Sequence, residues 1–343
     1  MKRAFITGIL FLLVVAVAAL AGAYWWLNRP LPLNGESVEV SIEAGSTPRQ
    51  VAQAWTDAGV RTHPRLLFEW FRWSGESKKI RAGSYEITAG TTPIQLLNKL
   101  VRGDESLATV RLIEGWTFRQ FRNELAHAEA LKPTTAGLSD AELMAALGAP
   151  GQHPEGRFFP DTYAYSKGSA DIAVLRRAYR AMQHRLDLAW QQRDTNLPLR
   201  GEDDALVLAS IVEKETGQAA DRGKVAGVFL NRLRVGMPLQ TDPTVIYGMG
   251  DAFDGNLRRR DLQADTPYNT YVHAGLPPTP ISMPGAASLL AAVKPQPTRA
   301  LYFVSRGDGS SEFSENLADH NRAVNRYQRS QGGRPASSAG TPP

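Results

Sequence analysis

The sequence predicts an α+β protein that begins with one membrane-spanning helix. Three observations indicate this fold class. A long uncharged stretch opens the chain, a strand–turn–helix pattern then occurs twice, and the second half combines apolar helices with a late apolar strand near Tyr302–Val304. With 343 residues, of which 43% are hydrophobic, the chain is long enough for more than one domain with its own core.

The first predicted element is a transmembrane helix. Residues 4–27 carry no charged side chain, and a helix of this length can cross a hydrocarbon core of roughly 30 Å. Lys2 and Arg3 precede it, which predicts a cytoplasmic N-terminus, and Trp25 and Trp26 stand where an interfacial aromatic belt belongs. We therefore expect a single-pass anchor in the cell inner membrane, with the remaining chain in the periplasm.

The alternative for this stretch is a cleaved signal peptide, with Ala19-Leu20-Ala21 as its cleavage site. An apolar stretch of this length exceeds the usual signal-peptide core of roughly 7–15 residues, which favours the uncleaved anchor. Under either interpretation, residues 30–343 lie outside the cytoplasm, so ATP-dependent chemistry is not expected.

The amino-acid composition limits which partners, metal sites and cofactors the protein can have. The net charge of +5 suits an anionic polymer or a membrane surface, and equally a solvated Arg-rich surface. The absence of cysteine excludes disulfides and thiolate metal sites, and the six histidines lack ligand spacing, so we expect no metal and no cofactor. The run Arg258–Arg260 raises the alternative of DNA binding, but export of the chain argues against any nucleic-acid partner.

An internal repeat follows the anchor. Residues 42–51 are matched by residues 87–96, and each copy joins an alternating strand to a helix through a Gly turn. We expect Ser46 and Thr91 to cap these helices, each followed by a proline in the first helical turn. A weaker third copy begins at Ile113.

Two interpretations of this repeat remain open. A strand–turn–helix unit of this type resembles a LysM module, a small fold that binds glycan strands, and the alternative is a scaffolding repeat. Between the copies, residues 66–73 predict an aromatic-rich helix containing Phe68, Trp70, Phe71 and Trp73. Aromatic residues at helical spacing are more often core than ligand platform, so we expect them to be buried.

A later helix carries two candidate acids. Residues 204–217 begin with an acidic residue, end with glycine and are apolar until Glu213, with Glu215 two positions on. Apolar neighbours and the negative end of the helix dipole both raise the pKa of a carboxyl there, as a general acid requires. Two positions differ by roughly 200° around a helix, so only one side chain can face a given cleft. Spacing does not decide which, and a solvated helix end is the alternative.

The loops that follow are rich in amide, hydroxyl, carboxylate and tyrosine side chains on Pro-Gly turns. Such side chains bind sugar hydroxyls and stack on apolar sugar faces. Residues 155–325 closely resemble the catalytic domain of the YceG-like family of endolytic peptidoglycan transglycosylases. The stretches that carry the resemblance are Glu155–Tyr163, Ala209–Thr216, Asn231–Leu233, Leu239–Tyr247, Tyr268–Tyr271, Gly275–Pro278, Leu301–Val304 and His320–Asn321.

The resemblance implies a site and an activity. The family's catalytic glutamate falls on Glu213, and one carboxyl is enough because the C6 hydroxyl of N-acetylmuramic acid is itself the nucleophile. The implied reaction cleaves the β-1,4 bond between N-acetylmuramic acid and N-acetylglucosamine inside nascent strands, leaving 1,6-anhydromuramic ends and limiting strand length. The expected substrate-binding residues are Gln240, Thr241, Asp242, Tyr247, Tyr268, Asn269 and Tyr271.

The resemblance also implies partnership with penicillin-binding proteins. One departure is visible, because the family often carries a His just before the Phe of its last strand and none precedes Phe313. The alternatives are a lysozyme-like hydrolase, with Glu213 as acid and Asp242 as base, and a membrane-tethered peptidoglycan-binding scaffold. The expected organisation is an anchor with its cytoplasmic tip at 1–29, a LysM-like region at 30–106, a YceG-like catalytic domain at 107–328 and a disordered tail at 329–343.

Overall fold

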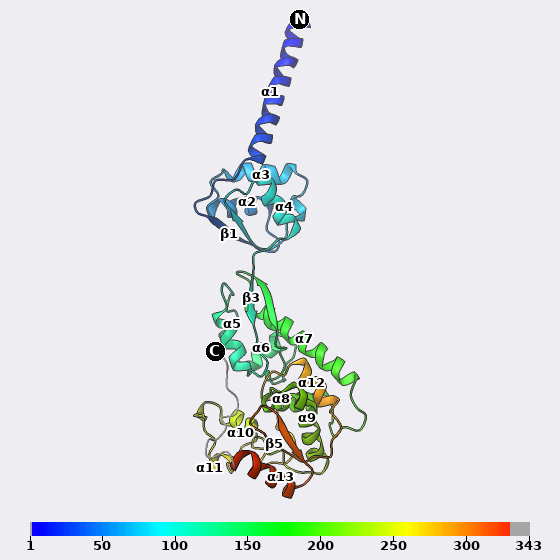
Figure 1. Cartoon of the computed structure of the whole chain (residues 1–343). Helices are drawn as coiled ribbons and strands as arrows, with labels where there is room; N and C mark the ends of the chain where they lie inside the picture. Colours follow the sequence, from blue (N-terminus) through cyan, green and yellow to red (C-terminus); the bar gives the residue numbers. More distant parts are fainter. Residues whose placement is uncertain (1, 330–343) are drawn as a thin grey trace. The chain divides into compact units, whose positions relative to one another are not determined.

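The structure is a computed structural model that describes residues 2–329 and separates into two compact units (Figure 1). Unit 1 comprises Met1–Thr109, Glu129–Lys132 and Ala164–Ser169, and unit 2 comprises the rest of the chain. The chain therefore passes between the two sets of residues five times. Sequence reasoning placed a boundary after residue 106, and the first passage follows residue 109. Residues 330–343 of the expected disordered tail lie outside the described residues.

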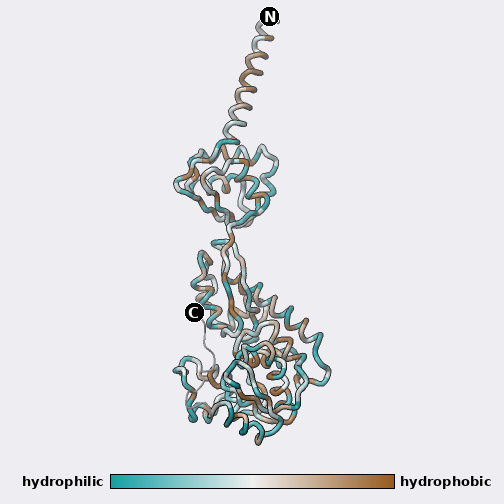
Figure 2. The backbone as a smooth tube through the Cα atoms, in the orientation of Figure 1, coloured by the Kyte–Doolittle hydropathy of each residue, from teal (hydrophilic) through white to brown (hydrophobic). Residues whose placement is uncertain are grey.

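Unit 1 begins with the apolar helix α1 (Lys2–Asn28), which is coloured as hydrophobic along most of its length in Figure 2. Residues Ile6–Asn28 are long and apolar enough to cross a membrane. Near its end, Trp26 packs against the hydrophobic core of unit 1. The helix is compatible with the single-pass anchor that the sequence predicts.

The rest of unit 1 is a small sheet covered by helices. Strands β1 and β2 pair antiparallel from Ser37↔Thr88 to Ile42↔Gly83, and Trp55, Phe71 and Tyr85 are fully buried in the core beneath them. The elements are β1 (Ser37–Ile42), α2 (Pro48–Asp57), α3 (Pro64–Trp73), β2 (Gly83–Thr88) and α4 (Pro93–Arg102).

The two repeat copies share one helix-capping device. The caps are Thr47 and Thr92, one residue later than the expected Ser46 and Thr91. Each threonine accepts a hydrogen bond from the backbone of the Gln three positions on, whose side chain accepts from the threonine backbone in return. This reciprocal box requires a Gln or Glu at the third helical position, which fixes the cap at the threonine. The third copy repeats it with Thr117.

Strands β3 and β4 form a second two-stranded sheet, and β5 and β6 form a third, antiparallel one with Phe303 opposite Phe313. The remaining elements are β3 (Leu107–Arg111), α5 (Phe118–His127), α6 (Asp140–Ala146), β4 (Thr162–Ser166), α7 (Asp171–Gln191), α8 (Glu202–Glu215), α9 (Ala219–Arg234), α10 (Asp242–Met249), α11 (Arg259–Leu262), α12 (Ala286–Val293), β5 (Tyr302–Ser305), β6 (Ser311–Ser314) and α13 (Leu317–Val324).

Helix α8 is the centre of unit 2. Every residue from Ala205 to Val212 is buried, and α7, α9, α10 and α12 pack around it. An all-round apolar helix is buried because no face suits water, as the sequence of this segment indicated. The consequence is that the polar end of α8, from Glu213 onward, emerges from the core at a fixed place. The structure thus confirms a mixed helix-and-strand protein with an N-terminal apolar helix.

Candidate active site

A cleft of about 1900 Å³ runs through unit 2. Its walls come from α5, α6, the end of α8, α10, β5 and α13, and the loops between them. Such a large, extended space suits a polymer with several binding positions better than a small ligand, whose pockets measure roughly 300–1,000 Å³. The aromatic residues that line the cleft are Phe118, Tyr247, Phe253, Tyr268, Tyr271, Tyr302 and Phe303.

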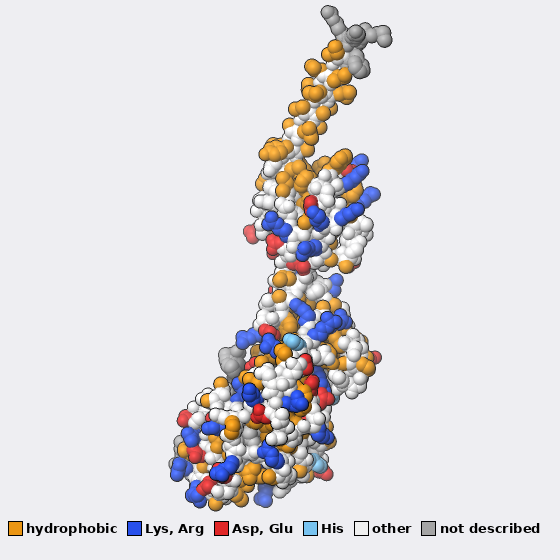
Figure 3. All heavy atoms as spheres, turned by 90° about the vertical axis from the view of Figure 1, so that its right-hand side faces the viewer, with side chains coloured by type: hydrophobic (Ala, Val, Ile, Leu, Met, Phe, Trp, Pro, Cys, Tyr) orange, Lys and Arg blue, Asp and Glu red, His pale blue; other side chains and the backbone are white. Residues whose placement is uncertain are grey.

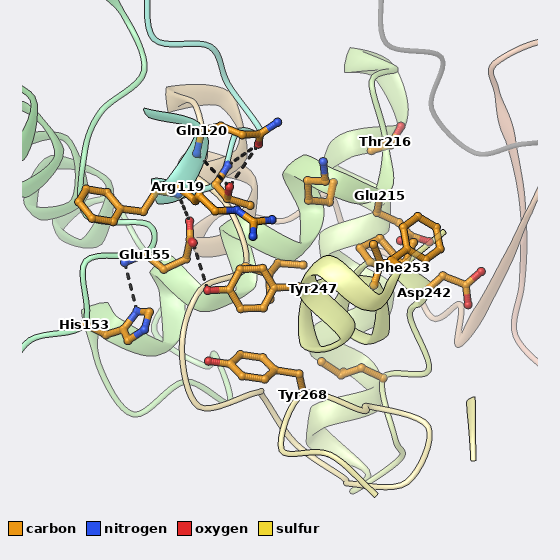
Figure 4. Close-up of a pocket in the computed structure, with 18 of the residues that line it drawn as sticks. Arg119, Gln120, His153, Glu155, Glu215, Thr216, Asp242, Tyr247, Phe253 and Tyr268 are labelled. Carbon is orange, nitrogen blue, oxygen red and sulfur yellow. Dashed lines mark hydrogen bonds between the residues drawn. The ribbon is translucent and has the colours of Figure 1, made fainter. Parts of the chain in front are cut away.

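Glu215 enters the cleft from the C-terminal end of α8 (Figure 4). The Thr241 hydroxyl donates a hydrogen bond of 2.8 Å to its Oε2. The pKa of Glu215 is raised to about 7, mainly by burial and to a smaller extent by the negative charge of Asp242, while the Thr241 bond opposes the shift. Glu215 is thus a carboxyl that holds its proton near neutral pH and can also release it there.

Glu213 lies elsewhere. Its Oε2 accepts a hydrogen bond of 2.9 Å from the backbone N–H of Gly285, which precedes α12, and it is absent from the cleft lining. The Glu114 side chain packs against Gly285 as well, and burial together with the charge of Glu213 raises the pKa of Glu114. Of the two glutamates at the end of α8, Glu215 therefore lines the cleft and Glu213 does not, while the catalytic role that the resemblance implied for Glu213 stays a prediction.

Arg232 on α9 lies close enough to Glu215 for its charge to act on the Glu215 carboxyl. It is only 7% exposed, and its guanidinium donates to the carbonyls of Leu301 at 2.7 Å and Leu239 at 2.6 Å. The guanidinium also lies over the Tyr302 ring, 5.4 Å from its centroid. Its positive charge partly opposes the rise in the Glu215 pKa. One buried cation therefore connects β5 to the loop before α10 and moderates the acid.

Five of the expected substrate-binding residues line the cleft together. The Tyr271 hydroxyl donates a hydrogen bond of 2.6 Å to Asp242, beside Glu215, and the rings of Tyr247 and Tyr268 meet edge to face at 4.9 Å. These rings offer flat apolar surface next to carboxylate and amide groups, the combination that binds sugars. The five are Gln240, Asp242, Tyr247, Tyr268 and Tyr271.

The other two expected residues are buried and do not line the cleft. Thr241 contacts Glu215 as described, so its part is to hold the acid. Asn269 is fully buried, and its amide donates to the carbonyls of Asp261, Leu262 and Ala264. Asn269 is thus placed to organise the loop that presents Tyr268 and Tyr271, and contact between Asn269 and substrate stays a prediction.

Glu155 is a second cleft carboxyl that sequence reasoning did not place in the site (Figure 4). It is 3% exposed and accepts hydrogen bonds from the Phe118 N–H at 3.0 Å and the Tyr247 hydroxyl at 3.1 Å. Burial raises its pKa to about 7, against both hydrogen bonds. The available signal was a charged residue set between apolar neighbours, Pro154 and Phe158, in a stretch otherwise typical of a core.

Replacing Glu155 with Gln should flatten the dependence of stability on pH. Between its ordinary pKa of 4.5 and about 7, the folded protein keeps a proton that the unfolded chain has lost, so Glu155 lowers stability as pH rises through this window. Above pH 7 the variant should therefore be more stable, by at most about 3 kcal/mol. Urea unfolding of the full chain at pH 5 to 8 measures this, with exposed Glu315→Gln as control. An unchanged slope would contradict the assignment.

Gln240 has a strained backbone at the cleft. Its φ is +49°, and its N–H donates to the Thr270 carbonyl at 3.0 Å, which holds it in place. Left-handed geometry costs a non-glycine residue about 1 kcal/mol. We expect Gln240→Gly to unfold with a free energy about 1 kcal/mol higher than Gln240→Ala. Both variants lack the amide, so equal activity loss with unequal stability would separate binding from strain, whereas equal stability would refute the strain.

The cleft lining also includes a stacked pair of rings from β5 and α13. The rings of Tyr302 and His320 lie 5.1 Å apart at 24°. Burial lowers the pKa of His320, and the nearby Arg232 charge lowers it further. The imidazole is consequently neutral at neutral pH and presents a flat surface rather than a charge.

Comparison with known proteins matches this geometry to one family. Residues 40–326 match the model of the YceG-like family, which covers most of the chain and all of the cleft residues named above. The chain is 30% identical over 308 residues to the endolytic murein transglycosylase of Bacillus subtilis strain 168, covering 85% of each protein. It is 26% identical to the endolytic murein transglycosylase of Streptococcus pneumoniae R6, covering 96% of this chain and 66% of the pneumococcal protein.

A solved structure is also similar to this chain. A crystal structure of a YceG-like protein from Listeria monocytogenes has a TM-score of 0.52 and 28% sequence identity, and it covers 84% of this chain and 98% of its own. From the extent of the family match, this chain belongs to the YceG-like family.

Proposed function

We propose that this protein is a membrane-anchored endolytic peptidoglycan transglycosylase, a lyase that cuts glycan strands between N-acetylmuramic acid and N-acetylglucosamine. The observation that carries the proposal is Glu215, a carboxyl with a pKa near 7 in an extended cleft lined by aromatic rings. The family membership and the activity named for the Bacillus and pneumococcal relatives support it.

In the proposed mechanism, Glu215 acts first as an acid and then as a base. The protonated carboxyl gives its proton to the glycosidic oxygen as the bond to C1 breaks, and the departing sugar leaves with a free hydroxyl. The carboxylate then accepts the proton of the muramic C6 hydroxyl while that oxygen bonds to C1. Glu215 ends protonated again, and the strand ends in 1,6-anhydromuramic acid.

The surroundings of Glu215 fit both steps. A pKa of about 7 leaves acid and carboxylate both populated at neutral pH, so one group can give and take the proton. Thr241 fixes the carboxyl by its hydrogen bond. The paired rings of Tyr247 and Tyr268, and the stack of Tyr302 on His320, supply surfaces for successive sugars along the strand.

A hydrolase remains the second candidate because Asp242 also faces the cleft beside Glu215. A second carboxylate could activate water in place of the C6 hydroxyl. The two candidates differ in their products. Hydrolysis leaves a reducing muramic end, whereas the lytic reaction leaves an anhydro end, which is lighter by the mass of one water molecule.

The proposed setting is the inner membrane. Lys2 and Arg3 at the start of α1 support a cytoplasmic N-terminus, which sends both folded units to the periplasmic side where peptidoglycan lies. We propose that unit 1, with its LysM-like repeat, binds glycan strands and that penicillin-binding proteins are partners. Neither role is needed for the chemistry at Glu215.

Mass spectrometry of strand fragments tests the activity. The full chain in detergent is incubated with uncrosslinked glycan strands, beside the variants Glu215→Gln and Glu213→Gln. Anhydromuramic ends from the wild type and Glu213→Gln, but not from Glu215→Gln, are expected. Reducing ends would establish the hydrolase instead. Intact strands, under conditions where a control transglycosylase cuts them, would favour a binding scaffold.

A further inference from the structure

Helix α3 in unit 1 has an exposed face that the fold does not use. Trp73 is 78% exposed and Leu66 is 50% exposed, and because Trp73 follows Leu66 by seven positions, about two helical turns, both lie on one side of the helix. Sequence reasoning expected the aromatic residues of this helix to be buried, and Phe71 is. Trp73 differs, because its indole faces water while the Arg72 guanidinium lies over the ring at 5.8 Å.

Helix α3 lies beside the base of α1 (Figure 1). Just after α1, the Leu31 N–H donates to the Thr91 carbonyl at 2.8 Å, at the start of α4. The indole of Trp70 on α3 donates to the Pro93 carbonyl at 3.1 Å, two residues further on. Because the segment just after α1 and the middle of α3 contact neighbouring residues around the start of α4, α3 stands close to the base of α1 and so to a bilayer that α1 spans.

Basic side chains accompany the apolar ones. Residues 61–80 hold five Lys and Arg side chains against two Glu, a net charge of +3. Figure 3 shows hydrophobic atoms gathered on unit 1 near the base of α1, with Lys and Arg atoms beside them. Exposed Trp and Leu next to clustered Lys and Arg are typical of helices that lie in an anionic membrane interface.

We infer that α3 lies on the surface of the bilayer, with Leu66 and Trp73 in the headgroup region and the neighbouring basic side chains on anionic phospholipids. The inference rests on the proposed anchor and not on the catalytic site. Continuity with the apolar surface of α1 and charge complementarity favour lipid as the occupant of this face. Unit 1 is then held against the membrane at two points, the end of α1 and α3, which fixes its orientation.

The absence of cysteine makes the inference directly measurable. Leu66→Cys keeps Trp73 in place, and Trp73→Cys probes the second position. Each full-length variant carries a nitroxide label and is placed in nanodiscs of phosphatidylethanolamine and phosphatidylglycerol. Collision with oxygen, which concentrates in lipid, and with a water-soluble nickel complex then reports the depth of each label.

The control position is Ser41→Cys. Ser41 is exposed near the Ile42↔Gly83 end of the β1–β2 pair, opposite the Ser37↔Thr88 end that lies near the Leu31–Thr91 contact. We expect an oxygen-to-nickel ratio several-fold higher at residues 66 and 73 than at residue 41. In discs of phosphatidylcholine alone the ratio at residue 66 should fall, because the basic side chains lose their anionic partners.

A label at residue 15, from Val15→Cys in α1, separates failure of this inference from failure of the anchor. A deep label at 15 with water-exposed labels at 66 and 73 would overturn the inference and leave the anchor standing. A water-exposed label at 15 would overturn both. Labels at 66 and 73 that are shielded from both reagents and immobile would indicate a protein partner, such as a second copy, and would also overturn it.

Discussion

Replacing Glu215 with Gln is expected to lower the rate of strand cleavage by about 10³-fold, within the range that general acid–base groups contribute. The amide can still accept the hydrogen bond from Thr241, so the cleft should keep its shape while losing the transferable proton. The measurement is the rate of anhydromuramic end formation at saturating strand concentration, at pH 6, where the acid form dominates.

Glu213→Gln is the matched control. It makes the same chemical change two residues away on the same helix, and its amide oxygen can still accept from the Gly285 N–H. We expect cleavage within a few-fold of the wild type. If Glu213→Gln abolished cleavage and Glu215→Gln did not, the geometric assignment would fail and the assignment implied by sequence would stand.

The pH profile adds an independent test. The first step requires protonated Glu215, so the cleavage rate should fall as pH rises above about 7. Glu155 has a raised pKa in the same range and lines the same cleft, so a profile of the wild type alone does not identify the group. Glu155→Gln should keep this alkaline fall. Its disappearance in that variant would assign the titration to Glu155.

Arg232→Met is expected to cost about 3 kcal/mol of unfolding free energy, because two buried carbonyls lose a charged donor. It should also move the alkaline fall of the cleavage rate to higher pH. Arg232 lowers the pKa of Glu215, so removal of its charge lets that pKa rise further. Urea unfolding and the pH profile of cleavage measure the two effects on one variant.

Arg234→Met is the control, because Arg234 is exposed two residues further along α9. It should change the unfolding free energy by less than about 0.5 kcal/mol and leave the pH profile alone. An Arg232 variant that loses stability with an unshifted profile would show a purely structural role. A shift to lower pH would contradict the electrostatic coupling to Glu215.

How far the sequence predicts the site is shown by α8. The all-apolar run and the acidic start predict a buried helix, and the structure has one at Glu202–Glu215. Rotation per residue shows that only one of Glu213 and Glu215 can face the cleft. The choice depends on where α12 and the loop before α10 pack, since Gly285 binds one carboxyl and Thr241 the other. Those contacts join residues some 26 to 72 positions apart and carry no local signal.

The local sequence also did not predict the positions of Glu155 and Trp73. Glu155 lines the cleft together with Tyr247, which lies 92 positions away in the sequence and donates a hydrogen bond to it. Trp73 is exposed because ten residues of α3 present one face to the core and leave the other to solvent, which an aromatic count does not distinguish. Helix caps are easier to predict from the sequence, because all the residues of the Thr92–Gln95 capping box lie within four positions of one another. Even there, the cap lay one residue beyond the expected one.

The interleaved boundary between the two units has a consequence for biosynthesis. Unit 1 includes Glu129–Lys132 and Ala164–Ser169, so its full set of residues has left the ribosome only when about half of the chain is made. When only the first hundred residues have been translocated, unit 1 is therefore incomplete. It can form all its contacts only after residues 129–132 and 164–169 have followed. A shortened chain that begins at Val110 would retain both segments without their partners, so a soluble fragment cut there should express poorly and be readily digested.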